Sequence, residues 1–128
     1  MAARRLDVSL RIVKTLHSAG VRILAGTDAP MPLVYPGYAL HKELELLVDA
    51  GMSPADALRA ATIWPAEFLG ISESRGSIEI GKRADLVLLD ADPLKQISNT
   101  QRIRAVLLAG RLLRRADLDA LLAPPAAK

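Results

Sequence analysis

Residues 21–30 read VRILAGTDAP, and this stretch decides how the rest of the chain is interpreted. Its branched aliphatic residues favour a short buried β-strand over 21–25, and the small residues at its end permit close packing. Pro30 prevents continuation, because proline lacks the backbone donor and restricts the residue before it. Asp28 then lies just beyond the C-terminal end of the strand, where parallel α/β proteins place their active sites. Asp28 is therefore the first candidate for a functional residue.

The composition sets limits on the class of protein. A chain of 128 residues can form one domain with a real core, and a content of 51% hydrophobic but 3% aromatic residues predicts an aliphatic one. No apolar run is long enough for a membrane span, and the first residues lack the apolar stretch of a signal peptide, so we expect a cytoplasmic protein with no membrane partner. The absence of cysteine excludes disulfides and thiolate metal sites, including the Cys-x-x-Cys half of the zinc deaminase pattern.

The charge distribution argues against a nucleic-acid partner. The net charge is +3, and the 17 basic residues are interleaved with 14 acidic ones along the chain. Nucleic-acid binding requires a concentrated basic face, usually with aromatic side chains for single strands. We therefore interpret the basic residues as a solvated surface.

Helical patterns dominate the first part of the chain. Periodic apolar residues predict helices over 6–18 and 38–50, and the first has Leu6, Leu10, Val13 and His17 on one face. The sequence SPAD at 53–56 is a helix start, with serine at the N-cap, proline in the first turn and an acid at the third position. It predicts a helix to about residue 62, followed by a short helix over 65–70.

The second part is rich in strand patterns. Alternating Ile78 and Ile80 and the nearly continuous apolar run at 84–90 both indicate strands. Residues 103–108 and 111–113, joined by Ala109-Gly110, predict a hairpin, and 116–122 a small helix. We therefore divide the chain into residues 1–70, helical around one strand, and residues 71–128, rich in strands.

Neither part can complete its own sheet. One strand among helices has no partner, and about four strands are too few to close a barrel. The chain is therefore expected to be a piece of a larger structure.

Five segments carry a resemblance to a known family: LAGTD at 24–28, LHKELELLVDAGMSP at 40–54, ALRAAT at 57–62, PAEFLG at 65–70 and GSIEIGKRADLVLLD at 76–90. In this order and spacing, the chain resembles the C-terminal portion of a metal-dependent amidohydrolase. It is similar to the imidazolonepropionase-like and prolidase-like branch of that superfamily, over about residues 6–122.

The resemblance implies an α/β fold, the C-terminal fragment of a (β/α)₈ TIM-like barrel. Residues 1–70 would form the end of the barrel, with 21–25 as its last strand between flanking helices. Residues 71–128 would supply the C-terminal strands of a small composite β-sandwich and a terminal helix.

The resemblance also implies chemistry. Asp28 matches the aspartate that follows the last barrel strand, which ligates a divalent metal, zinc in our expectation. That aspartate accepts a proton from the activated water and passes it to the leaving nitrogen. The implied activity is hydrolysis of C–N bonds in small amides, cyclic amides or dipeptides.

The other ligands of the family's metal site would precede residue 6. They comprise a His-x-His pair, a lysine or carboxylated equivalent, and further histidines, whereas this chain has two histidines in all. A catalytic zinc site requires about three protein ligands. The isolated chain is therefore expected to be incomplete and inactive.

Several alternatives remain open at this point. Asp28 could be a helix cap or loop acid, and His41 a packed boundary histidine or a substrate contact. Tyr35 and Tyr38 could face substrate or cover the loop, and Asp28, His41 and Glu45 could form a local site. In a different class of function, the chain could be a non-catalytic interaction module or one half of a split enzyme. It would then associate with itself or a complementing chain through open strand edges.

Overall fold

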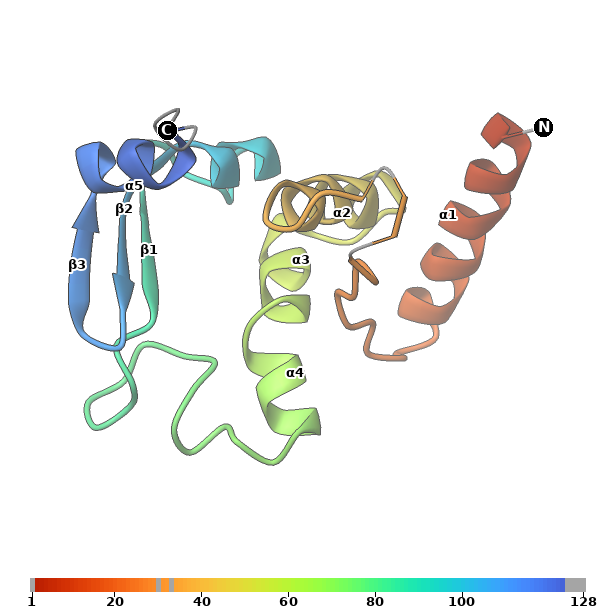
Figure 1. Cartoon of the computed structure of the whole chain (residues 1–128). Helices are drawn as coiled ribbons and strands as arrows, with labels where there is room; N and C mark the ends of the chain where they lie inside the picture. The colour runs from red at the N-terminus through yellow and green to blue at the C-terminus, as the bar shows by residue number, and fades with distance from the viewer. Residues whose placement is uncertain (1, 30, 33, 124–128) are drawn as a thin grey trace.

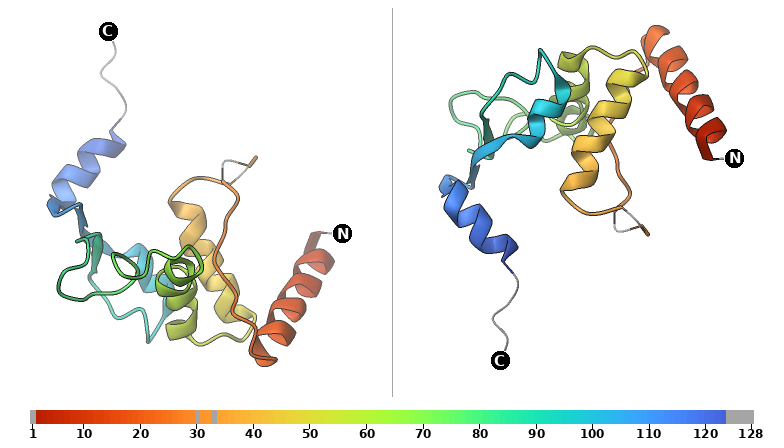
Figure 2. Two further views of the ribbon diagram at one scale, coloured as in Figure 1. Left: turned by 90° about the horizontal axis from the view of Figure 1, so that it is seen from below. Right: turned by 90° about the horizontal axis from the view of Figure 1, so that it is seen from above.

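The computed structural model describes residues 2–29, 31–32 and 34–123. The elements in chain order are α1 (Ala2–Ser18), α2 (Tyr38–Asp49), α3 (Pro54–Ala60), α4 (Ile63–Phe68), β1 (Leu86–Leu89), the 3₁₀ helix η1 (Ile97–Gln101), β2 (Ile103–Leu108), β3 (Arg111–Arg114) and α5 (Arg115–Leu122). Figures 1 and 2 show α1 at one end, the sheet with α5 at the other, and α2, α3 and α4 between them. In the part of the chain described, no helix is both long and apolar enough to span a membrane.

A small aliphatic core lies where α2, α3 and η1 meet. Its buried members are Leu44, Leu47, Met52, Ala57, Ala60 and Ile97. The first two come from one face of α2, as the helical period of the sequence predicts. No aromatic side chain belongs to this buried set, which confirms the aliphatic core expected from the composition.

The sheet contains three antiparallel strands in the order β1-β2-β3. The predicted hairpin is confirmed, since β2 and β3 pair up to Leu108 and Arg111. Ala109 begins the turn with a left-handed φ of 51°, and its N–H donates to Asp85 Oδ1 at 2.7 Å. This bond, aided by the guanidinium of Arg83, holds the pKa of Asp85 below its usual value.

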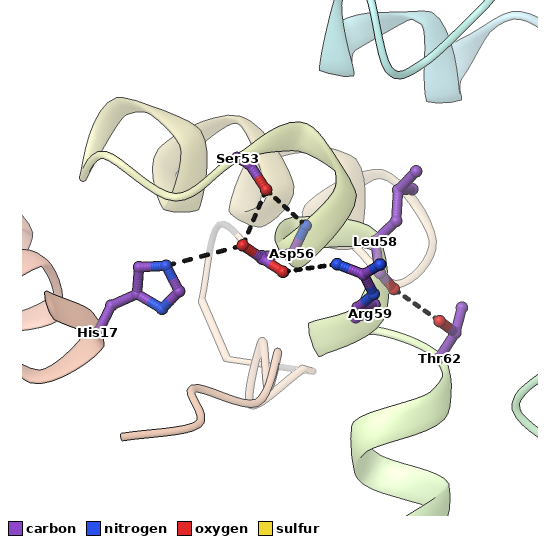
Figure 3. A network of polar contacts seen from close by, with 6 residues as sticks. All are labelled: His17, Ser53, Asp56, Leu58, Arg59 and Thr62. Carbon is purple, nitrogen blue, oxygen red and sulfur yellow. Dashed lines mark hydrogen bonds and ion pairs between the residues drawn. The ribbon is translucent and has the colours of Figure 1, made fainter. Parts of the chain in front are cut away.

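The start of α3 follows the predicted capping pattern (Figure 3). Ser53 Oγ accepts the N–H of Asp56 at 3.1 Å, and its hydroxyl donates to the Asp56 carboxylate at 2.8 Å. Together with Arg59 Nη1 at 2.8 Å, these contacts lower the pKa of Asp56. His17 Nε2 lies 3.9 Å from the same carboxylate, so this network also connects the end of α1 to α3.

The strand predicted over 21–25 does not form within this chain: residues 21–29 have no strand or helix structure. Their backbone contacts the body of the protein where the Ala25 N–H donates to Ala60 O at 2.9 Å. Side chains of Ile23 and Ala25 pack against the core. A strand requires a neighbour, and among the described residues the strands all belong to the β1-β2-β3 sheet.

The strand expected around Ile78 and Ile80 is also absent from the described residues. Both side chains are exposed, at 84% and 108%, so their alternation has no buried face to match.

The helix expected from residue 65 begins earlier, at Ile63, because proline is tolerated within the first turn. The 3₁₀ helix η1 was not predicted. The division into residues 1–70 and 71–128 stays a prediction.

The capping contact of Ser53 leads to a test of stability. Replacement Ser53→Ala removes the acceptor for the Asp56 N–H, so the free energy of unfolding should fall by about 1 kcal/mol. Urea unfolding followed by circular dichroism measures this change. The control Ser9→Ala removes an exposed hydroxyl that donates to Arg5 O within α1, and should change stability by less than about 0.5 kcal/mol. Equal effects of the two substitutions would contradict the capping role.

Candidate functional site

Asp28 is exposed, just after the irregular segment that packs against α2 and α3. Its φ of 52° is in the left-handed region, which aspartate tolerates better than most residues with a side chain. Within the described parts of the chain, no side-chain or backbone group donates a hydrogen bond to its carboxylate. Among these described residues, none occupies the exposed carboxylate, so a ligand could contact it.

Glu43 on α2 holds the segment that leads to Asp28. The Gly26 N–H donates to Glu43 Oε1 at 2.8 Å, two residues before Asp28. Glu43 was not among the site residues predicted from the sequence, although a signal existed. It directly precedes Leu44 and lies one turn before Leu47 on the apolar side of α2, where an acid is unexpected.

His41 joins α2 to η1. Its Nδ1 lies 3.1 Å from Thr100 Oγ1, while that hydroxyl donates to Ile97 O at 2.9 Å. Because the hydroxyl has one hydrogen, His41 Nδ1 is the donor and Nε2 carries the lone pair in the neutral ring. Burial lowers the pKa of His41, and the nearby charge of Glu45 opposes this effect in part. A substrate contact at His41 stays a prediction.

Tyr35 and Tyr38 flank the turn that begins α2. Both side chains are largely exposed, at 66% and 59%. The turn between them passes through Gly37, whose φ of 84° favours glycine. Hydrogen bonds among the described residues join neither tyrosine to Asp28 or His41, so the substrate-binding role of the tyrosines stays a prediction.

The donor groups present do not fit a complete metal site. No cluster of three or more His, Cys, Asp or Glu residues is found within the described ranges. Asp28, His41 and Glu45 therefore do not form a local site, and Glu45 instead accepts hydrogen bonds from Lys42 Nζ at 2.7 Å and Gln101 Nε2 at 2.8 Å. Asp28 can therefore supply one ligand of such a site but cannot hold a catalytic zinc by itself.

The lowered pKa of His41 predicts how stability depends on pH. In the unfolded chain a histidine titrates near its ordinary value of about 6.5, so between the two pKa values the unfolded state binds more protons. The contribution of His41 to the free energy of unfolding should thus be fully present above the pKa of the unfolded chain. It should be lost as the pH falls through the lowered pKa of the folded chain. Urea midpoints between about pH 5 and 7 measure this slope, which His41→Gln should reduce. A His41 ring-proton titration in the folded chain with a midpoint above the ordinary value would contradict the assignment.

Comparison with known proteins gives the family. A model described as the amidohydrolase family matches residues 2–113. Imidazolonepropionase from Thermoplasma volcanium is 33% identical over 104 residues, which cover 79% of this chain and 25% of that protein. Human N-acetylglucosamine-6-phosphate deacetylase is 31% identical over 103 residues, covering 80% of this chain and 21% of that enzyme.

A solved structure supports the same relationship. The crystal structure of a Xaa-Pro dipeptidase with bound methionine in its active site matches with a TM-score of 0.73 and 31% identity, over 82% of this chain and 25% of that chain. The chain thus spans about a quarter of the length of these relatives.

Proposed function

Because the chain belongs to the amidohydrolase family, we propose that its protein hydrolyses C–N bonds in small amides, cyclic amides or dipeptides with a divalent metal, zinc in the first instance. The names of the relatives, imidazolonepropionase, deacetylase and Xaa-Pro dipeptidase, support this class of reaction. The observation in this chain that carries the proposal is the exposed position of Asp28 at the end of the LAGTD segment.

Asp28 would serve as one metal ligand and as the proton shuttle. A bound metal would supply the activation of water at neutral pH. The carboxylate of Asp28 would accept a proton as the water attacks and would deliver it to the departing nitrogen. Its exposed position is compatible with both of these roles.

The remaining ligands would come from polypeptide outside these 128 residues, since the described residues gather no ligand set. In that setting, residues 21–25 would gain a neighbouring strand and become the last strand of a barrel. Residues 71–128 would contribute strands to a small β-sandwich. We infer that the chain alone has no hydrolytic turnover.

A chimera tests the role of Asp28. The matching quarter of the Xaa-Pro dipeptidase is replaced by this chain, and hydrolysis of Xaa-Pro dipeptides is measured. Replacement Asp28→Asn should lower kcat by at least about 100-fold, because asparagine cannot accept the proton. The control Asp119→Asn removes an acid that pairs with Arg115 on α5, and should leave the rate nearly unchanged.

Two results would contradict the proposal. One is full activity of the Asp28→Asn chimera. The other is amidase activity with stoichiometric zinc in the isolated 128-residue chain, which would show that no outside ligands are required.

A second candidate, association without catalysis, is favoured by the apolar surface of α1. Val8, Ile12 and Leu16 are exposed at 46%, 54% and 41%, and they line a shallow hollow with Arg11 and Thr15. A row of exposed aliphatic side chains on one helix is typical of a surface that another chain covers. The partner would be a second copy or a complementing chain.

Light scattering tests this second candidate. Wild type should form dimers or larger species, and Ile12→Asp should shift the population towards monomer because it places a charge in the apolar row. The control Ser18→Asp adds the same charge to α1 on the side away from Ile12 and Leu16, and should leave the association intact. A monodisperse wild-type monomer would exclude this candidate.

A further inference from the structure

Glu43 occupies an unusual place for an acid. It lies on α2 directly before Leu44, which is 4% exposed, and four residues before Leu47, which is 6% exposed. Residues 21–29 pass beside α2 (Figure 2), and the bond from the Gly26 N–H to Glu43 Oε1 crosses between the two. The carboxylate thus connects the helix to the segment that ends at Asp28.

The second oxygen of Glu43, Oε2, differs from Oε1 in its surroundings. Oε2 is enclosed and has no hydrogen-bond donor within the described residues. An enclosed carboxylate oxygen without a donor opposes folding. By contrast, Glu45, two positions further along α2, accepts hydrogen bonds from Lys42 and Gln101.

The backbone at Asp28 needs to be held. A left-handed φ is disfavoured for a residue with a side chain, and it persists where the surrounding structure fixes it. Two consecutive backbone donors anchor the chain just before this point, Ala25 to α3 and Gly26 to α2. The bond from Gly26 to α2 is the one closer to Asp28 along the chain. Its acceptor is the side chain of Glu43, which a substitution can remove.

We propose that Glu43 is the positioning residue for Asp28, because it fixes the Gly26 amide and so the direction in which the turn presents the Asp28 carboxylate. The inference rests on the proposed function in that Asp28 is taken as the functional acid. The geometry of the turn can nevertheless be measured without any reaction.

Nuclear magnetic resonance of the 128-residue chain tests the proposal. Glu43→Met keeps the length of the side chain and removes the acceptor, so exchange of the Gly26 amide should become at least about tenfold faster. The coupling between the amide and α protons of Asp28, which reports φ, should move to an averaged value. Glu43→Gln keeps an acceptor oxygen and should restore both signals to near the wild-type values.

Matched controls separate this role from general stability. Glu45→Met on the same helix should leave the Gly26 and Asp28 signals unchanged, and circular dichroism should show the same helicity in all variants. Unchanged Gly26 or Asp28 signals in Glu43→Met would overturn the proposal. If Glu43→Met does not fold, the folded Glu43→Gln variant decides. Faster Gly26 exchange together with an averaged Asp28 coupling in that variant would overturn the proposal, and wild-type values of both would support it. These readouts do not involve turnover, so they can fail independently of the Asp28→Asn chimera.

Discussion

The burial of one face of α2 against α3 and η1 is the interaction on which the rest of the structure depends. Leu44 and Leu47 of α2 belong to the small buried core. Two polar side chains of the same helix also bond to neighbouring segments. On one side Glu43 receives the Gly26 amide, and on the other His41 donates to Thr100. If α2 moved, the segment before Asp28 and the connection to the sheet would both lose their attachment.

Local chemistry explains which elements were predictable. The start of α3 is encoded in four adjacent residues, and the β2–β3 hairpin in two neighbouring strands with a short turn, so both were predicted from the sequence. The strands expected over 21–25 and around Ile78 depend on a partner strand, and sequence pattern carries no information on whether one is present. At the site, Asp28 followed from its place after an apolar run. Glu43 was missed because its role depends on a hydrogen bond from Gly26, which lies 17 positions away in the sequence.

The distribution of apolar surface agrees with the length of the relatives. The buried core is small, while Ile12, Ile78, Ile80 and Val87 are among many large apolar side chains left exposed. A chain spanning about a quarter of its relatives would leave such surfaces where the rest of those proteins packs. Under the proposed function, the same reasoning would explain why segment 21–29 has no neighbouring strand and why the described residues gather no set of metal ligands.

The attachment of α1 has a consequence for motion. Most of the side chains described for α1 are exposed, Val13 packs against the core, and His17 Nε2 lies 3.9 Å from the Asp56 carboxylate at the last turn. Opening of α1 would therefore break few contacts and leave the α2–α3 core intact, which is the property of an independent unit of local unfolding. Both contacts lie in the C-terminal half of α1, so we expect local unfolding of this helix to start from its N-terminal half.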